Sequence, residues 1–283
     1  MTTAITNGFI ELPQGKIATL NNHYDLKQSH ILAIHGWLDN AASFIPLMQS
    51  LPHFNWTAID LPGHGHSFHR PQHSHYHFID WVSDLATLIQ QEFTEKVTLV
   101  GHSLGGMLAT VIAGLYPELI SKLVLIDSAG LVVQDENEDV KTLREALDSR
   151  SKQLKKYKTH HISIQAAIKA RAQASDMKEA SVKLLVERNL LETEKGFQWL
   201  SDNRLRTRSP IRLSRSQAKS IITNIECPVL LCLAEQGYDS IKQALTEFRP
   251  DYSNLRLENV AGGHHCHMDE VQSTAYFIDD FLK

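Results

Sequence analysis

Continuous apolar runs alternate with helix-like patterns along most of this 283-residue chain. Parallel strands that are buried on both faces show such continuous hydrophobicity rather than an in–out alternation. Helix-like amphipathic stretches such as Ile79–Phe93 and Leu104–Tyr116 lie between the runs. The alternation predicts an α/β fold with a doubly wound, mostly parallel sheet, which binds ligands at the carboxyl ends of its strands. The expected strands are Ile31–Ile34, Trp56–Ile59, Val97–Val100, Leu123–Ile126, Pro228–Leu233 and Leu255–Val260.

The stretch 131–215 breaks this rhythm. It is rich in Lys, Arg, Ala, Leu and Gln, which favour helix, and it contains no convincing strand. We expect helices over Val140–Lys158, Ile162–Ser175 and Lys178–Leu191. The sequence therefore predicts a core domain, 1–130 with 216–283, and a helical cap (lid), 131–215.

The lid is basic, whereas the rest of the chain is acidic. Residues 141–219 contain 19 Lys or Arg and 8 Asp or Glu, although the whole chain has a net charge of −4. A solvated outer helix face explains this surplus. The alternative is that the lid attracts anionic substrates by electrostatic focusing.

The segment Val97–Gly106 contains a Gly-x-Ser-x-Gly motif between an expected strand and an expected helix. This context is that of a nucleophile elbow, in which a sharp turn raises a serine hydroxyl above the sheet edge. Gly101 and Gly105 lack the Cβ atoms that would collide there. We therefore expect Ser103 to be a covalent nucleophile.

A second loop, His35-Gly36-Trp37, directly follows the strand Ile31–Ile34. A serine nucleophile needs backbone donors for the oxygen that becomes negative in the tetrahedral intermediate. The N–H groups of Trp37 and Leu104 are the natural pair, so we expect them to form the oxyanion hole.

Three histidines follow the last expected strand, and one of them must act as the base. A serine hydroxyl attacks efficiently only when an imidazole takes its proton. We expect this role for His264, which directly follows Gly262-Gly263. His267 is expected to brace the loop, and His265 to point away.

Over essentially its whole length the chain resembles the α/β-hydrolase superfamily, and within it the serine hydrolase-like proteins and their bacterial relatives. The resemblance implies the α/β-hydrolase fold, a helical cap inserted after the sixth strand, and a Ser–His–acid triad that includes Ser103 and His264. The matching segments are His35–Asn40, Asp60–Ser67, Gly101–Gly106, Arg204–Leu213, Gly237–Ser240 and Gly262–His267.

The acid departs from the usual superfamily pattern. Most members carry it after the strand that matches Pro228–Leu233, but here Gln236 or Gly237 occupies that position. Haloalkane dehalogenases, which resemble this scaffold, take their acid from the end of the strand that matches Leu123–Ile126. Asp127 stands there, 24 residues after Ser103. We expect Asp127 to orient the imidazole, with Asp239 and Glu235 as alternatives.

The sequence gives little indication of a metal, cofactor, nucleic-acid or membrane partner. His73, His75 and His77 alternate, but few carboxylates or cysteines accompany them, so we expect a solvated loop and no metal or organic cofactor. The Arg-rich stretch 204–215 lacks the interleaved aromatic residues of a nucleic-acid surface. No apolar run is long enough for a membrane span. The three cysteines favour a reduced, cytoplasmic protein.

These observations predict a serine hydrolase that cleaves a carboxylic ester or related acyl bond of a small molecule through an acyl-enzyme on Ser103. The alternative is a ligand receptor or scaffold that keeps the fold but turns over little, because fold does not imply function. The displaced acid favours this alternative, whereas the complete Ser–His pair and the oxyanion loop oppose it.

Overall fold

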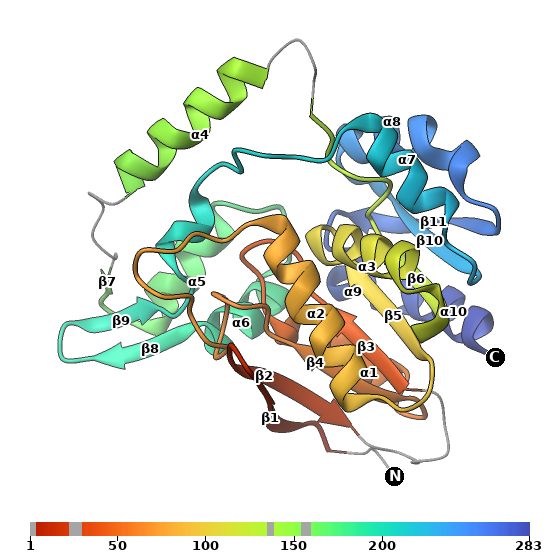
Figure 1. Ribbon diagram of the computed structural model, residues 1–283. Helices are drawn as coiled ribbons and strands as arrows, with labels where there is room; N and C mark the ends of the chain where they lie inside the picture. The colour runs from red at the N-terminus through yellow and green to blue at the C-terminus, as the bar shows by residue number, and fades with distance from the viewer. Residues whose placement is uncertain (1–3, 23–29, 135–138, 154–159) are drawn as a thin grey trace.

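An eight-stranded sheet forms the centre of the molecule (Figure 1). The computed structural model describes residues 4–22, 30–134, 139–153 and 160–283. The strand order is β1-β2-β4-β3-β5-β6-β10-β11. The bounds are β1 Thr6–Leu12, β2 Gly15–Asn22, β3 His30–Ile34, β4 Asn55–Ile59, β5 Val97–His102, β6 Ile120–Ile126, β10 Val229–Gln236 and β11 Leu255–Gly263.

From β4 to β11 every neighbouring pair of strands is parallel, which confirms the doubly wound, mostly parallel sheet. Each expected apolar run lies in one of these strands, except that Pro228 directly precedes β10. The antiparallel hairpin β1–β2 was not predicted, and β2 joins it to β4. Strand β1 is largely exposed, so it has no continuous apolar run to reveal it.

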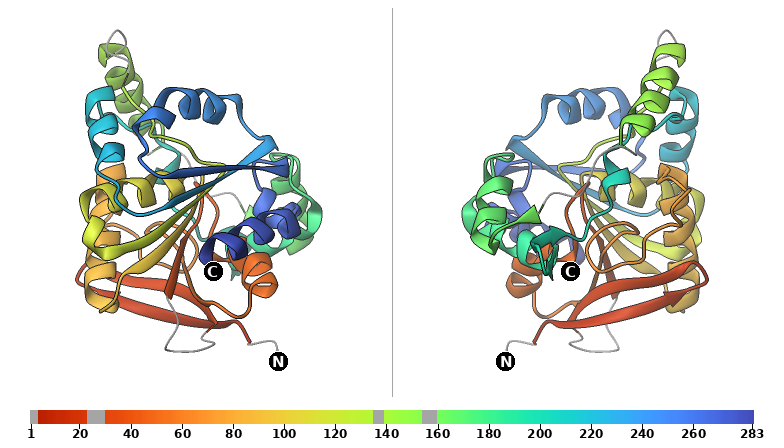
Figure 2. Two further views of the ribbon diagram at one scale, coloured as in Figure 1. Left: turned by 90° about the vertical axis from the view of Figure 1, so that its right-hand side faces the viewer. Right: turned by 90° about the vertical axis from the view of Figure 1, so that its left-hand side faces the viewer.

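Helices cover both faces of the sheet (Figure 2). The larger core cluster joins one face to α2, α3, α7 and α8, and the second cluster joins the other face to α1, α9 and α10. The bounds are α1 Ile45–Ser50, α2 Phe78–Glu92, α3 Leu104–Leu115, α7 Arg215–Thr223, α8 Asp239–Phe248, α9 Cys266–Asp269 and α10 Val271–Leu282, with 3₁₀ turns η1 Ala41–Phe44, η2 Pro117–Leu119 and η4 Arg249–Asp251.

The elements between β6 and α7 are separate from the central sheet. They comprise α4 Asp139–Gln153, β7 His160–His161, α5 Ile164–Ala172, α6 Glu179–Arg188, β8 Leu190–Thr193, β9 Gly196–Trp199 and η3 Asn203–Arg206. Buried residues of α5 and α6, such as Val182 and Leu185, form a small cluster that also includes Met268 of the core. We propose that this segment, 131–215, acts as the lid.

The lid differs from its purely helical prediction. The expected helix Lys178–Leu191 ends at Arg188, and β8 and β9 then form an antiparallel hairpin that pairs with β7. Gly196, at φ 103°, adopts the backbone conformation that the hairpin turn requires. The expected helix Val140–Lys158 ends at Gln153, and its last residues lie outside the described ranges.

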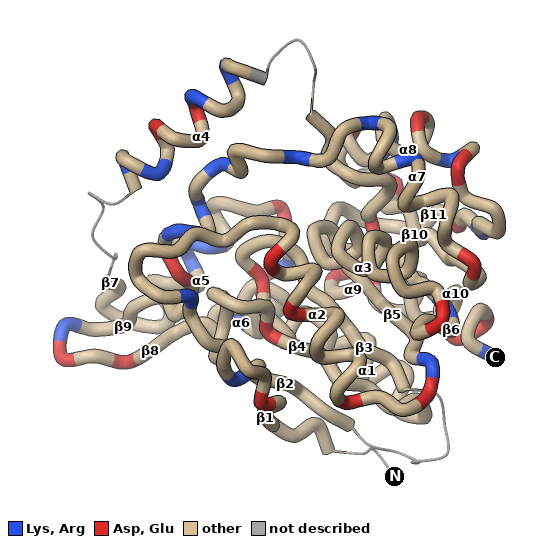
Figure 3. The backbone as a smooth tube through the Cα atoms, in the orientation of Figure 1, with Lys and Arg blue, Asp and Glu red and all other residues tan. Residues whose placement is uncertain are grey.

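Helix α4 stands apart from the packed layers in both Figure 1 and Figure 2. Its larger apolar residues are exposed, with Val140 82% accessible to solvent and Leu147 51%, whereas Ala146 is buried. Lys and Arg lie along α4 and along the segment that returns from the lid to α7 (Figure 3). In the part of the chain that the structure describes, no helix is both long and apolar enough to cross a membrane.

Candidate active site

Ser103 occupies the sharp turn between β5 and α3, with φ 50° and ψ −117°. The turn is tight on both sides. A Cβ on Gly101 would lie 2.5 Å from the carbonyl oxygen of Gly105, and a Cβ on Gly105 would lie 2.0 Å from that of Ile34. Larger residues at these positions would push strand and helix apart. The two glycines therefore allow the elbow that lifts Ser103 to the sheet edge.

Backbone strain is concentrated around Ser103. Among the described residues, three that are not glycine have positive φ: Leu38 at 63°, Ser103 at 50° and Asp127 at 39°. Such angles are costly for side chains with a Cβ, and they occur where the surrounding structure imposes them. All three residues follow strands of the central sheet, and each lies in or beside a segment that the sequence assigned to catalysis.

The side chain of His264 links Ser103 to Asp127. Its Nε2 is 2.9 Å from Ser103 Oγ, and its Nδ1 is 2.6 Å from Asp127 Oδ2. A carboxylate can only accept, so Nδ1–H donates to Asp127, and Nε2 is left to accept the Ser103 hydroxyl proton. The chain of hydrogen bonds thus fixes the tautomer that a general base requires.

Asp127 follows β6 and is fully buried. Its Oδ1 accepts a 3.1 Å hydrogen bond from Ala234 N–H on the neighbouring strand β10. A Cβ on Gly237 would lie 2.6 Å from both oxygens of this carboxylate. An aspartate at position 237, one of the two candidates for the usual acid position, would therefore collide with Asp127.

The two alternative acids lie elsewhere. The Asp239 side chain is 91% exposed, and its nearest described cation is Lys242 of α8 at 4.0 Å. Glu235 is exposed at the end of β10. In the described ranges neither residue has a hydrogen bond to His264, so Asp127 is the acid that the structure brings to the imidazole.

The backbone N–H groups of Trp37 and Leu104 flank this site. Trp37 follows β3, and Leu104 is the first residue of α3, where the positive end of the helix dipole lies. Within the described residues neither N–H donates to a protein acceptor. Both are therefore available to donate to an oxyanion, and their role in an oxyanion hole stays a prediction.

Two buried histidines support the oxyanion loop. His64 Nε2 accepts a hydrogen bond from Leu38 N–H at 3.2 Å, and His35 Nε2 accepts one from Leu61 N–H at 2.9 Å. Burial lowers the pKa of His64 to about 3, and the charge of His35 adds to this effect. Burial likewise lowers the pKa of His35. Both rings therefore stay neutral and can accept these bonds.

The other two histidines of the loop are buried as well. His265 does not point away into solvent: its Nε2 lies 3.2 Å from Asp39 Oδ2. His267 packs against His102, with ring centroids 4.3 Å apart, and neither of its ring nitrogens has a partner among the described residues. Burial lowers the pKa of His267 to about 3, and the charge of His265 adds to this effect.

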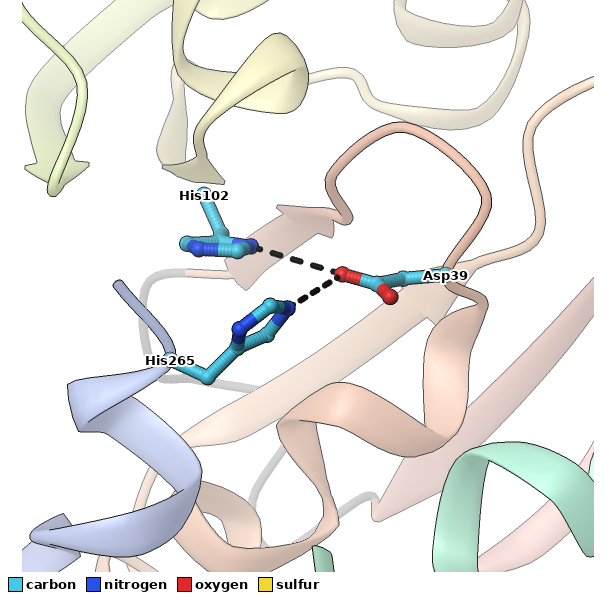
Figure 4. A group of neighbouring side chains, drawn as sticks. All are labelled: Asp39, His102 and His265. Carbon is cyan, nitrogen blue, oxygen red and sulfur yellow. Dashed lines mark hydrogen bonds and ion pairs between the residues drawn. The ribbon is translucent and has the colours of Figure 1, made fainter. Parts of the chain in front are cut away.

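Asp39, His102 and His265 form a second cluster of polar side chains (Figure 4). His102 Nε2 donates to the carbonyl oxygen of His264 at 2.9 Å. Burial alone would raise the pKa of Asp39, but the hydrogen bond and charge of His265 and the charge of Arg171 lower it overall. Asp39 therefore remains ionised in the interior.

The donor atoms of this cluster lie within 4.8 Å of one another, and their types are those of a zinc or iron site. However, both Asp39 oxygens have protein partners, because Arg171 Nη2 donates to Oδ1 at 2.9 Å. We therefore interpret the cluster as a connection between lid helix α5, the oxyanion loop and the loop of the base. Sequence reasoning did not find this role for Asp39 or Arg171, which come from distant segments.

Comparison with known proteins identifies the family and the fold. The family model described as "alpha/beta hydrolase fold" matches residues 29–269. The chain belongs to the α/β-hydrolase family. Serine hydrolase-like protein of Danio rerio is 26% identical over 265 residues, which cover 89% of this chain and 81% of that protein.

Solved structures of other α/β hydrolases are similar over nearly the full length. A hypothetical protein of Pseudomonas aeruginosa PAO1 has a TM-score of 0.90 and 31% identity, with 98% of this chain and 99% of that chain covered. The thioesterase domain from the curacin biosynthetic pathway has a TM-score of 0.83 and 25% identity, with 97% and 99% covered. The hydrolase fold expected from the sequence is thereby confirmed.

Proposed function

We propose that this α/β hydrolase is a serine hydrolase that cleaves a carboxylic ester or related acyl bond of a small molecule. The observation that carries the proposal is the continuous hydrogen-bonded path from Ser103 Oγ through His264 to Asp127. Relatives named as serine hydrolase-like proteins, and the similarity to a thioesterase domain, agree with acyl chemistry.

In the proposed mechanism Ser103 Oγ attacks the acyl carbonyl while His264 Nε2 takes the hydroxyl proton. Asp127 stabilises the resulting imidazolium, and the N–H groups of Trp37 and Leu104 stabilise the oxyanion. His264 then protonates the leaving alcohol, which departs and leaves an acyl ester on Ser103. Water, activated by His264, hydrolyses that ester and restores the enzyme.

Labelling by a fluorophosphonate probe tests the nucleophile, because the probe reacts with activated serines. We expect the wild type to be labelled and to hydrolyse p-nitrophenyl acetate, butyrate or octanoate. Ser103→Ala should lose both properties. An unlabelled wild type would overturn the assignment of the triad and favour the low-turnover receptor on the same fold.

A further inference from the structure

A cavity of about 270 Å³, here called the lid pocket, lies between the lid and the oxyanion loop. Leu38, Leu185, Val186 and Trp199 contribute apolar walls. The lid pocket also contains the side chains of Arg171 and Arg206. It therefore combines a surface suited to a hydrocarbon chain with guanidinium groups suited to an anion.

The lid pocket is connected to the catalytic segments at two points. Leu38 is the residue after Trp37, and the Trp37 indole N–H donates to the carbonyl oxygen of Leu205, the residue before Arg206, at 3.0 Å. Arg171 bonds Asp39, whose other oxygen faces His265, the neighbour of His264 in the chain. The wall of the pocket is therefore joined to the oxyanion loop directly, through Leu38, and to the loop of the base indirectly, through Arg171 and Asp39.

The charges around the pocket do not cancel. The carboxylate of Asp202 is held by Arg204, with an Nη2–Oδ2 distance of 2.6 Å, and accepts the hydroxyl of Tyr76. The carboxylate of Asp39 is held by Arg171. Arg206 has no carboxylate partner among the described residues.

The surroundings of Arg206 make its positive charge less favourable than in water. Loss of water around the side chain lowers its pKa, and the charge of Arg171 lowers it further. A bound anion would relieve both effects. Arg206 still lies at the exposed rim of the pocket, so solvent screens its interaction with a ligand in part.

We propose that the lid pocket selects substrates with a carboxylate at the end of an apolar chain, and that Arg206 binds this carboxylate. The inference rests on the proposed hydrolase function, since it names the substrate class of that site. The guanidinium fork fits a carboxylate, and the apolar walls fit the methylene groups between it and the scissile bond. The basic surplus of the lid would raise the local concentration of such anions.

Matched esters test the proposal and show on which side of the ester the carboxylate lies. One pair is mono-p-nitrophenyl adipate and p-nitrophenyl hexanoate, which differ only at the far end of the acyl chain. The other pair is the butyryl ester of 6-hydroxyhexanoate and that of hexan-1-ol. For at least one pair, Arg206→Gln should lower the anionic-to-neutral ratio of kcat/KM about tenfold, as expected for a charged hydrogen bond at a screened rim.

Arg212→Gln is the matched control, because Arg212 is exposed, lies outside the lid pocket and carries the same charge. It should leave both ratios within twofold of the wild type. The neutral ester of each pair is the internal reference: damage to Ser103 would lower both rates and leave their ratio unchanged, which separates substrate selection from such damage. Equal ratios in the two variants for both pairs would overturn the proposal.

Binding can be tested even if hydrolysis fails. Calorimetry with monohexyl adipate and the inactive Ser103→Ala protein should show binding that weakens about tenfold when Arg206→Gln is added. Dihexyl adipate should show no such difference. Monohexyl adipate binding that is unaffected by Arg206→Gln would overturn the carboxylate site, whether or not Ser103 proves to be a nucleophile.

Discussion

The sheet edge, which carries Ser103, His264 and Asp127, differs from the lid in how fully its polar side chains are buried and paired. At the sheet edge Asp127 is fully buried, and all the polar atoms of the triad side chains have partners at 2.6–3.1 Å. In the lid, by contrast, Arg206 lies at an exposed rim, and no described residue provides a carboxylate partner for it. We infer that the sheet edge determines which bond can be broken, whereas the lid determines which molecule is presented. Changes at the edge should lower kcat for every ester, and changes in the lid should alter discrimination or stability.

Of these changes, Asp127→Asn should have the largest effect on activity. The amide can no longer hold His264 in the required tautomer or stabilise its imidazolium, so kcat should fall by about 10⁴-fold on any ester. Steady-state hydrolysis of p-nitrophenyl butyrate measures the effect. Asp239→Asn is the matched control and should keep wild-type kcat, and a larger loss in the control would move the acid to α8.

Gly237→Ala tests the position of the same carboxylate from the loop that follows β10. Its Cβ would lie 2.6 Å from both Asp127 oxygens and would displace them. A misplacement of about 1 Å can cost about 100-fold, so we expect kcat to fall by that factor while the protein stays folded. Glu235→Ala, an exposed neighbour on β10, should have wild-type kcat. An active Gly237→Ala would show that Asp127 need not hold this position.

Arg171→Met removes the ion pair that joins lid helix α5 to Asp39 in the loop after β3. It leaves Asp39, whose side chain is only 2% exposed, without its cation, and Arg171 itself is 23% exposed. We expect the free energy of unfolding to fall by about 2 kcal/mol, less than for a fully buried pair. Urea unfolding measures this loss, and the double variant Asp39→Asn/Arg171→Met should recover part of it. If the double variant loses the full sum of both single changes, the pair is not coupled.

Low pH should lower the free energy of unfolding because it favours protonation of His64 and His267 in the unfolded state. Each has a folded-state pKa of about 3, below the unfolded value of about 6.5, so the unfolded state binds more protons between these limits. The free energy of unfolding should fall by about 1 kcal/mol per histidine for each pH unit below about 6. Denaturant unfolding at pH 7, 6, 5 and 4 measures the slope. His267→Met should make it shallower, whereas exposed His66→Gln should not.

Local sequence pattern was sufficient to predict the parts of the candidate site that depend on backbone turns. Gly101-His102-Ser103 and His35-Gly36-Trp37 each follow an apolar run, so strand and loop could be placed from the sequence alone. The sheet topology then brings the ends of parallel strands to one edge. For this reason Ser103, His264 and Asp127, which are far apart in the chain, could be expected to meet.

Long-range side-chain contacts could not be predicted from local sequence pattern. Asp39 and Arg171 are 132 residues apart, and nothing in either segment indicates the other. The hairpin β8–β9 was missed because Leu190–Trp199 contains charged residues in an otherwise helix-like composition. Its only local signal was Gly196, which a turn explains as well as a helix end.

The positive φ angles of Leu38, Ser103 and Asp127 also bear on how this protein could be engineered. Glycine adopts such angles freely, so selection for heat resistance alone would favour glycine at these positions. At positions 103 and 127 that gain would remove the proposed reacting groups. A library screened only for thermal tolerance should therefore accumulate inactive proteins, and activity must be selected in the same round.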